Sequence, residues 1–586
     1  MKRSVLRLLA LGVLLSACQS ISQGPSPRTP LADGGIEALA DEYLAAWLVR
    51  YPETGTRRGL AGARHDRLFD NSAAALVRWH AQEDGWLARL RALPEPPIGS
   101  RDWLTRGLLL EALEASRAVR ICRRPLWETS TTTGWHRSLP FVFDVQPVAT
   151  PEERRWALKR LAALEPYIET EIANLRRGLV DGYSSPQVTV AGVPGEVRVL
   201  LGSDSPFQGM AERASDEPFA DAVAALLRDR IHPAIERFAR FIETDYLPAA
   251  RQQLAISAHP DGAACYRALV RSFSTLSRDP AEVHRLGQRQ MAAIREEMRS
   301  VLAEYAPGEP LTAFLRRLAQ DPALTFESED AVLAYNRAAL RGARAAMSRA
   351  FHDLPKAQVL VKPYPAYAAS GVGEYHASSE DGSRPGIFYL AVRDPRTRPR
   401  ATQQSTLYHE TYPGHHLQGA LALEQGQQVH RLARYLGNAG YSEGWALYAE
   451  RVAQELGLYG DAIDVMGLLS DQGARAARLV VDTGLHTLDW SREQAVDYML
   501  RNTGWSRTDI ENDVNRYISW PGQANSYMLG MLTITALRER AQAAQGADFD
   551  WRDFHREVLR HGQLPLPMLE ETIAHWLKAG QRAASD

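Results

Sequence analysis

The chain has 586 residues, of which 45% are hydrophobic and 24% are charged. This length exceeds the usual size of a single hydrophobic core, so we expect one large unit or two closely packed lobes. There are 68 basic residues against 70 acidic ones, for a formal net charge of -2. A balance so close to neutrality gives no reason to expect nucleic acid or another polyanion as a partner.

The first eighteen residues differ from the rest of the chain. Three basic residues precede an apolar run from Leu8 to Leu15, which is too short to span a bilayer and is typical of a secretory signal. The run ends in Leu-Ser-Ala-Cys, which resembles the bacterial lipobox. That resemblance implies that Cys18 is lipidated and, because Gln19 follows it, that the protein is exported to the periplasmic face of the outer membrane. The alternative is a plain signal peptide with an incidental cysteine.

Residues 19–35 are rich in Ser, Pro and Gly and lack an apolar period, so we expect a flexible tether before a globular region over 36–586. Two cysteines remain after the signal, Cys122 and Cys265. One disulfide or two free, buried cysteines are both compatible with the sequence. We interpret them as structural in either case, because neither has neighbours with metal-ligand spacing.

From residue 36 onward the dominant pattern is helical, with apolar residues three or four positions apart. The pattern predicts helices over 36–50, 73–93, 101–119, 152–179, 217–242, 280–304, 329–352, 400–412, 441–456, 462–486, 491–501, 509–517, 522–543 and 567–579. A mostly α fold class follows, which we expect to form two lobes around a cleft suited to short peptides.

Residues 355–394 interrupt the helical pattern. Two β-like runs, 358–362 and Gly386–Val392, are separated by Gly- and Ser-containing stretches. We expect a small sheet directly before the helix that carries His409. The strand at Gly386–Val392 either aligns an extended substrate along a free edge or belongs to a purely structural hairpin.

The most informative stretch covers residues 409–416 and reads His-Glu-Thr-Tyr-Pro-Gly-His-His. A His-Glu pair on a helix opens the H-E-x-x-H motif, in which two histidines one turn apart bind zinc and the glutamate is the general base. His409 and Glu410 fit that opening, but the fifth position is Pro413 rather than histidine. A second histidine must therefore reach the metal in another way.

A later histidine can reach the metal only if the helix is broken. In a regular helix His409 and His416 would lie about 10 Å apart along the axis, whereas a zinc–nitrogen bond is only about 2 Å long. Pro413 lacks the N–H of a regular helix and Gly414 tolerates unusual dihedral angles, so this pair can form a bulge. Either His415 or His416 is then the ligand, and helical phase slightly favours His416.

A second motif, Ser-Glu-Gly-Trp-Ala-Leu-Tyr-Ala-Glu over residues 442–450, offers the third ligand. Glu443 completes the set of two histidines and one carboxylate that is typical of catalytic zinc, so we expect one Zn²⁺ per chain. Glu450 lies two turns later on the same face and is a candidate to orient a histidine. The same donor set also describes non-heme iron sites, but the adjacent Glu410 favours hydrolysis.

Together the two motifs resemble those of DUF885, a bacterial family of uncharacterised function with HExxPGHH followed by EGWALYAE. The family is distantly similar to helical gluzincins such as the angiotensin-converting enzyme and carboxypeptidase Taq groups. Angiotensin-converting enzymes carry an Arg-Tyr pair whose tyrosine stabilises the tetrahedral intermediate, and Arg516-Tyr517 lies in a comparable place. This resemblance implies Tyr517 as the first candidate for that role and Tyr527 as the second. His486 is a further candidate donor to the oxyanion.

These residues predict a zinc peptidase that cleaves short peptides with a metal-activated water and Glu410 as general base. Two alternatives stay open. One is a zinc hydrolase of a non-peptide amide or ester, and the other is a catalytically silent lipoprotein that binds a partner. We expect a peptide substrate, no nucleic-acid partner, and membrane contact only through the lipid anchor.

Overall fold

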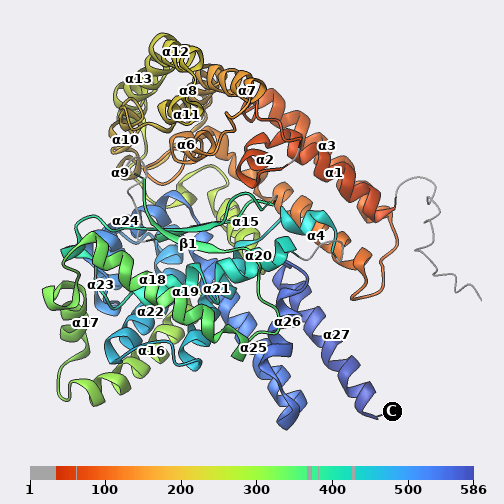
Figure 1. Ribbon diagram of the computed structural model, residues 1–586, viewed down its shortest axis with the longest axis vertical. Helices are drawn as coiled ribbons and strands as arrows, with labels where there is room; N and C mark the ends of the chain where they lie inside the picture. The colour runs from red at the N-terminus through yellow and green to blue at the C-terminus, as the bar shows by residue number, and fades with distance from the viewer. Residues whose placement is uncertain (1–34, 61, 366–372, 381, 425–428, 586) are drawn as a thin grey trace, which may run out of the picture.

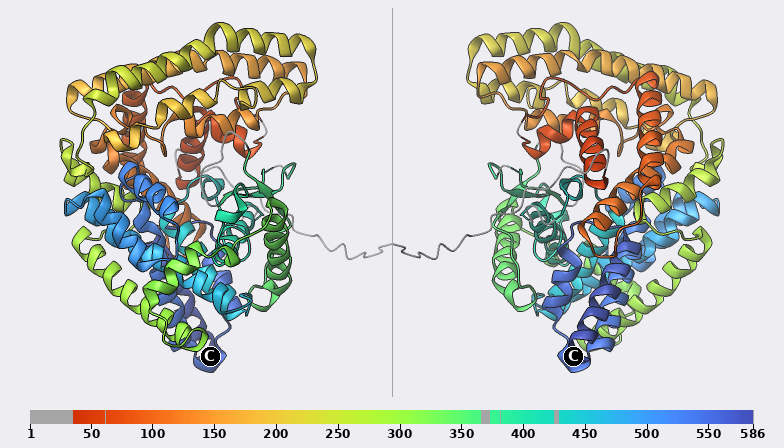
Figure 2. Two further views of the ribbon diagram at one scale, coloured as in Figure 1. Left: turned by 90° about the vertical axis from the view of Figure 1, so that its left-hand side faces the viewer. Right: turned by 90° about the vertical axis from the view of Figure 1, so that its right-hand side faces the viewer.

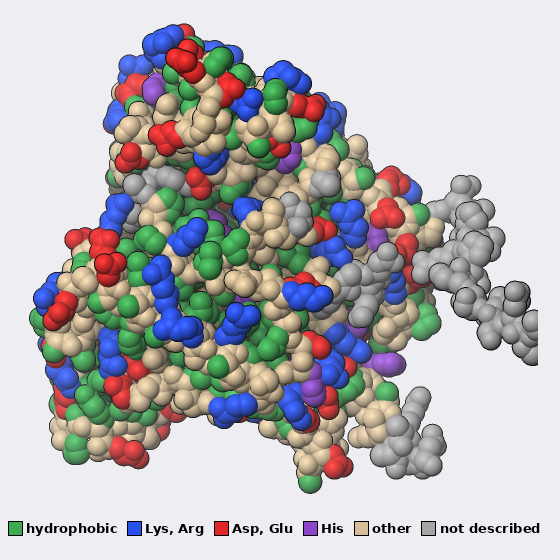
Figure 3. All heavy atoms as spheres, viewed as in Figure 1, with side chains coloured by type: hydrophobic (Ala, Val, Ile, Leu, Met, Phe, Trp, Pro, Cys, Tyr) green, Lys and Arg blue, Asp and Glu red, His purple; other side chains and the backbone are tan. Residues whose placement is uncertain are grey.

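The structure is a computed structural model that describes residues 35–60, 62–365, 373–380, 382–424 and 429–585. These residues are mostly helical, as predicted, with one small sheet. The signal segment, Cys18 and the expected tether lie outside the described residues. Within the described part, no helix combines the length and the apolar character needed to cross a membrane. Side chains of both charges are interspersed over the face shown in Figure 3, as a net charge near zero predicts.

The upper lobe in Figure 1, drawn in orange and yellow, is built on an apolar core whose residues run from Trp135 to Ala250. Its helices are α5 (Trp135–Ser138), α6 (Pro140–Asp144), α7 (Pro151–Ala162), α8 (Leu164–Asp181), α9 (Gln187–Val190), α10 (Val193–Val199), α11 (Pro206–Ala214), α12 (Glu217–Leu226), α13 (His232–Phe241) and α14 (Leu247–Ala249). Helix α7 begins at a capping box, in which the side chains of Thr150 and Glu153 each accept the other's backbone N–H. The single helix predicted over 152–179 is two helices, α7 and α8, which meet at Ala163.

The lower lobe contains the helices that follow residue 260, and the first helices of the chain pack on it. One apolar core joins Leu39 and Leu109 to Trp445 and Leu569. These helices are α1 (Ile36–Arg50), α2 (Pro52–Arg58), α3 (Ala73–Ala92), α4 (Arg101–Val119), α15 (Gly262–Ser274), α16 (Pro280–Tyr305), α17 (Leu311–Gln320), α18 (Glu329–Ala346), α19 (Gln403–Glu410), α20 (His415–Glu424), α21 (Ala439–Glu455), α22 (Ala462–Thr487), α23 (Arg492–Asn502), α24 (Arg507–Ser519), α25 (Ser526–Gln545), α26 (Trp551–Leu559) and α27 (Leu566–Ser585). Figure 2 shows the long yellow helices of the upper lobe lying across the top of the molecule.

The predicted helices with long apolar periods agree best with the structure. The bounds predicted for α1, α4, α16 and α22 lie within one residue of those observed. Helices α15, α17, α20 and α26 were not predicted. Packing against neighbours, rather than a long local pattern, stabilises these shorter helices.

A three-stranded sheet lies between α18 and α19 in the chain. Strands β1 (Val359–Pro363) and β3 (Gly386–Leu390) correspond to the two predicted runs and pair in parallel. Strand β2 (Gly373–His376), which was not predicted, pairs antiparallel with β3. Because β3 is the central strand, both of its edges are occupied, and the prediction that Gly386–Val392 offers a free edge to a substrate is wrong. Among the described residues, β2 is the edge strand that contacts α19.

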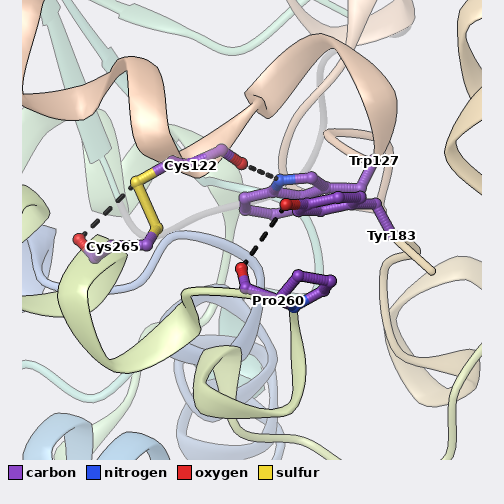
Figure 4. The surroundings of a disulfide bond; sticks show 5 residues. All are labelled: Cys122, Trp127, Tyr183, Pro260 and Cys265. Carbon is purple, nitrogen blue, oxygen red and sulfur yellow. Dashed lines mark hydrogen bonds between the residues drawn. A yellow bond between two sulfur atoms is a disulfide. The ribbon is translucent and has the colours of Figure 1, made fainter. Parts of the chain in front are cut away.

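A disulfide joins Cys122, which follows α4, to Cys265 of α15 (Figure 4). The two cysteines are 143 positions apart in the sequence, and their Cα atoms lie 4.9 Å apart. The indole N–H of Trp127 donates to the Cys122 carbonyl at 2.8 Å, and the Tyr183 hydroxyl donates to the Pro260 carbonyl at 3.4 Å. The sequence left the pairing of these cysteines open. A disulfide is expected in an oxidising compartment.

Candidate metal centre

The helix that opens the metal motif stops at a short turn around Pro413, as the sequence predicted. The Tyr412–Pro413 peptide bond is cis. Gly414 is required in this turn, because a Cβ at that position would lie 1.9 Å from the carbonyl oxygen of His409. The indole N–H of Trp445 donates to the Pro413 carbonyl at 3.0 Å. This hydrogen bond connects the turn to α21, the helix that carries the second motif.

Helices α19, α20 and α21, labelled in Figure 1, each contribute one donor atom to a cluster beside the turn. Oε2 of Glu443 lies 3.4 Å from Nε2 of His409 and 3.4 Å from Nε2 of His415. The two imidazole rings are nearly perpendicular, with centroids 4.8 Å apart. The His409 side chain is almost fully buried, whereas those of His415 and Glu443 are 17% and 19% exposed. We call these three residues the metal cluster, and it is accessible to solvent through His415 and Glu443.

The spacing of the metal cluster fits a tetrahedral ion better than direct hydrogen bonds. A tetrahedral ion with bonds of about 2.0–2.1 Å separates its ligand atoms by about 3.3–3.4 Å. A good N–H···O hydrogen bond is shorter, at about 2.7–3.2 Å. Two imidazoles and one carboxylate are also the donor set of catalytic zinc sites. The cluster therefore fits one divalent cation such as zinc.

Glu450 lies behind His409, where the seven-residue spacing from Glu443 places it. Its Oε1 accepts a hydrogen bond from Nδ1 of His409 at 2.8 Å. Its Oε2 accepts from Ser405 at 3.2 Å and from Gln472 at 2.9 Å. With the proton at Nδ1, the His409 ring presents Nε2 as the acceptor. Burial by itself would lower the pKa of His409, but the carboxylates of Glu443 and Glu450 outweigh burial and raise that pKa to about 10.

Glu410 is the remaining ionisable side chain at the centre. His409, Glu410 and His415 each offer a ligand atom, and these atoms lie within 4.8 Å of one another. We assign Glu443 as the ligand instead of Glu410, because Glu443 lies 3.4 Å from both imidazoles. Burial raises the pKa of Glu410; the two histidines oppose that shift, and the carboxylates of Glu443 and Glu374 add to it. A raised pKa suits a carboxylate that takes a proton from water.

The structure does not bring His416 to the metal cluster. The ring is fully buried, with Nε2 donating to the Ala357 carbonyl at 3.1 Å and Nδ1 accepting from the Tyr375 hydroxyl at 3.0 Å. Burial lowers the pKa of His416 to about 4. The slight preference for His416 is therefore corrected to His415. That preference assumed a continuous helical phase, which the turn at Pro413 interrupts.

Tyr527 lies closer to the metal cluster than the first candidate, Tyr517. The Tyr527 ring stacks on His409, with centroids 6.2 Å apart and planes 20° apart. Its hydroxyl accepts from Nη2 of Arg516 at 3.0 Å, which leaves its own hydrogen for another acceptor. The Tyr517 hydroxyl is directed elsewhere and donates to Asp513. We therefore reverse the order of the two candidates.

Helix α25, which carries Tyr527, approaches the metal cluster through glycine contacts. A Cβ on Gly530 would lie 1.8 Å from the Gly440 carbonyl oxygen, and a Cβ on Gly444 would lie 2.5 Å from the backbone of Gly530. Only glycines permit this crossing of α21 and α25. Because Gly444 directly follows Glu443, one motif supplies both the ligand and the contact that brings Tyr527 near it.

His486 is not available as an oxyanion donor, and this prediction is corrected. Its Nδ1 accepts from the backbone N–H of Ile256 at 3.1 Å, and its Nε2 donates to the Tyr517 carbonyl at 3.0 Å. Burial lowers its pKa to about 3. Both ring nitrogens are thus used by the backbone, and the side chain connects α22 to neighbouring segments.

Sequence reasoning missed two side chains that support the centre, Ser405 and Gln472, and named Arg516 only as the neighbour of Tyr517. Ser405 precedes His409 by one helical turn, so its place on the same face was readable from the spacing. Gln472 lies on α22, and no local pattern connects it to the motifs.

A second group of possible ligands fits a metal less well. His352, Asp550 and Asp553 offer atoms within 4.8 Å of one another, but His352 and Asp553 are exposed. Asp550 already caps α26 through the backbone N–H of Arg552 and pairs with its guanidinium at 2.6 Å. The buried centre on α19, α20 and α21 is therefore the better candidate.

One known family model matches most of the globular region. The sequence model of DUF885, described as a bacterial protein of unknown function, matches residues 52–573. The chain belongs to the DUF885 family. No curated protein matches this DUF885 chain.

Two solved structures share the fold of this DUF885 protein, and both are described as candidate lipoproteins. The one from Colwellia psychrerythraea is 27% identical, with a TM-score of 0.86, and the match covers 93% of this chain and 100% of that chain. The one from Shewanella oneidensis, of unknown function, is 15% identical, with a TM-score of 0.72 and coverage of 92% and 100%. Their descriptions agree with the lipobox that ends at Cys18.

Proposed function

We propose that this DUF885 protein is a zinc metallopeptidase that hydrolyses short peptides. The observation that supports the proposal most directly is the 3.4 Å separation of Glu443 Oε2 from the Nε2 atoms of both His409 and His415. This spacing fits a tetrahedral zinc ion. Glu410, adjacent to a ligand, corresponds to the general base of H-E-x-x-H sites.

In this proposal the metal cluster holds one Zn²⁺. When bound, zinc supplies Lewis acidity toward water and toward a carbonyl group. Glu410 accepts a proton from the attacking water and passes it to the leaving nitrogen, a role that commonly contributes about 10²- to 10⁴-fold. Tyr527 donates its hydroxyl hydrogen to the developing oxyanion. Glu450 fixes the orientation of the His409 ring through the hydrogen bond at Nδ1.

The test is zinc content measured together with peptide cleavage. The purified full chain and Glu410→Gln are each analysed for zinc and incubated with a library of short peptides, whose products are identified by mass spectrometry. We expect about one zinc per chain in both proteins and turnover in the wild type alone. Glu539→Gln, which alters an exposed carboxylate on α25, is the matched control and should cleave normally.

The other outcomes of this test select the alternatives. Zinc binding with hydrolysis only of non-peptide amides or esters would identify a zinc hydrolase of another class. A chain without bound zinc and without turnover would instead be a silent binding lipoprotein. Equal peptide cleavage by wild type and Glu410→Gln would contradict the assigned base.

We further propose that the protein is exported and anchored by lipid at Cys18 on the periplasmic face of the outer membrane. The lipobox and the two candidate lipoproteins of the same fold support this proposal. The Cys122–Cys265 disulfide is in keeping with an oxidising compartment. Replacing Cys18 with Ala should remove the protein from the outer-membrane fraction. An unchanged distribution of that variant would contradict lipid anchoring.

A further inference from the structure

Two arginines near Tyr527 share a single carboxylate. Nη2 of Arg478 donates to Oδ2 of Asp513 at 3.0 Å, and Nη1 of Arg516 donates to Oδ1 at 3.2 Å. The Tyr517 hydroxyl donates to the same carboxylate. We call Arg478 and Arg516 the arginine pair. One positive charge of this pair has no negative counterpart in these contacts.

Two other buried carboxylates on α22, Asp482 and Asp471, make no ion pair with the arginine pair among the described residues, although Asp482 lies within electrostatic range of Arg516. Asp482 accepts from the Tyr266 hydroxyl at 2.5 Å and from the Asn525 side chain at 2.8 Å, and burial raises its pKa to about 7. Asp471 lies 3.5 Å from Nη1 of Arg475. Among the described residues, neither carboxylate accepts a hydrogen bond from the arginine pair. A buried charge without a partner is costly, so an anion from outside the chain would stabilise it.

The arginine pair lies directly behind the ring that stacks on His409. The guanidinium carbon of Arg478 is 4.5 Å from the centre of the Tyr527 ring. Arg478 is buried, and its Nη1 has no hydrogen-bond partner among the described residues. The Arg516 side chain is 22% exposed and contacts the Tyr527 hydroxyl at 3.0 Å. Arg516 is therefore the member of the pair that a ligand can reach beside the metal cluster.

Two further arginines lie at the end of α2, beside the segment that follows β2. Arg57 and Arg58 end that helix, and neither guanidinium has an ion pair or hydrogen bond among the described residues. The backbone N–H of Glu380 donates to the Arg58 carbonyl at 2.9 Å, which holds the end of α2 against the segment after β2. Burial raises the pKa of Tyr375 on β2, Arg58 opposes that shift and Glu410 adds to it. Tyr375 thus lies within the electrostatic range of both groups.

We infer that the protein binds a substrate carboxylate beside the metal cluster, with Arg516 as the contacting side chain and Arg478 behind it. The inference rests on the proposed peptidase function and specifies its substrate as a peptide with a carboxylate near the scissile bond. Because Nη2 of Arg516 already donates to Gln523 at 2.5 Å and to Tyr527 at 3.0 Å, the contact with the substrate is a charge-assisted hydrogen bond rather than a bidentate fork. Arg57 and Arg58 add positive charge on the α2 side, which Glu53, Glu374 and Glu380 offset in part.

Such a carboxylate is either the C-terminus of the peptide or an acidic side chain, and matched substrates separate the two. Three peptides of equal length are compared: a neutral sequence with a free C-terminus, the same sequence as a C-terminal amide, and the amide with one glutamate. We expect kcat/KM for the free acid or for the glutamate peptide to exceed that of the neutral amide by about 30-fold or more, since losing one partner of a desolvated charge pair has an effect of this size. Equal cleavage of all three peptides overturns the inference.

Variants of Arg516 test the contact itself. In Arg516→Gln, the ratio of kcat/KM for the preferred anionic peptide to kcat/KM for the neutral amide should fall by about 30-fold, beyond any loss that both peptides share because the hydrogen bond to Tyr527 is removed. Arg492→Gln is the matched control. Arg492, on α23, is 23% exposed and donates to Asn515, which lies on α24 next to Arg516. An equal loss for the anionic and neutral peptides in Arg516→Gln overturns the inference, since Arg516 would then only position Tyr527. The double variant Arg57→Gln/Arg58→Gln, which alters one exposed and one half-buried arginine, should lower the preference for anionic peptides without lowering Tm.

Binding measurements distinguish a failure of this inference from a failure of the proposed function. The acid and amide peptides are titrated calorimetrically into Glu410→Gln, which needs no turnover. A preference for the acid without hydrolysis by the wild type supports the carboxylate site and removes the peptidase proposal. Hydrolysis by the wild type with equal affinity for acid and amide keeps the peptidase and removes the carboxylate site.

Discussion

The upper lobe and the metal centre bury different kinds of side chain. The upper-lobe core is aliphatic and aromatic, with Phe207 and Phe238 fully buried. Helices α19, α21 and α22 instead bury His409, Glu450 and Gln472. Burying polar groups is costly unless they are hydrogen-bonded, and these three are bonded to one another. The upper lobe is thus stabilised by packing, whereas the metal centre gives up apolar packing for a fixed polar geometry.

Removing a metal ligand should have the largest effect and should be confined to the metal centre. In Glu443→Ala we expect zinc affinity to fall by far more than the about 10- to 100-fold typical of losing an outer hydrogen bond, because a coordinating atom is lost. Competition with a chromophoric chelator measures the change. Glu455 lies on the same helix as Glu443 and pairs with Arg538 at the surface. The control variant Glu455→Ala should therefore bind zinc normally. Tight, stoichiometric zinc in Glu443→Ala would remove Glu443 from the cluster.

A cavity in the upper lobe should change stability without changing the metal centre. Phe238→Ala should lower the free energy of unfolding by about 3–5 kcal/mol, because a fully buried ring is removed from an apolar core. Denaturant titration measures the loss, and the exposed Val180→Ala serves as the control, with a change within about 0.5 kcal/mol. If zinc affinity fell in parallel with stability, the two regions would not be independent.

Altering Glu450, which lies behind His409, should have an intermediate effect on zinc affinity. In Glu450→Gln we expect zinc affinity to fall by about 10- to 100-fold, because the variant loses the carboxylate that orients the ring and holds its proton at Nδ1. Isothermal titration of the apoprotein measures the change. An affinity equal to that of the wild type would mean that helix packing alone orients His409.

Alanine variants of the adjacent histidines His415 and His416 should differ in zinc affinity. The change should be the smallest of this series in His416→Ala. Zinc affinity should stay within about tenfold of the wild type in His416→Ala, although loss of its buried hydrogen bonds costs about 1–3 kcal/mol of stability. His415→Ala should lose zinc as Glu443→Ala does. The reverse result for the two variants would identify His416 as the ligand.

Local spacing was enough to predict much of the centre. The apolar period predicted the bounds of α16 and α22, and the seven-residue interval on α21 placed Glu450 on the same face as Glu443. Pro413 and Gly414 predicted that the helix breaks. The direction of that turn depends on Trp445, which donates to the Pro413 carbonyl from another helix, so the sequence did not choose between His415 and His416.

The sequence by itself determined the chemistry available to this protein: three histidines, three glutamates and a helix break within two short motifs. Tertiary structure decided which partners those groups have. It enclosed β3 between two strands, buried His486 among backbone groups, and brought Tyr527 to His409 instead of Tyr517. Local pattern carries no information on such contacts, because they depend on where helices distant in the chain can approach most closely, as α21 and α25 do at Gly444 and Gly530.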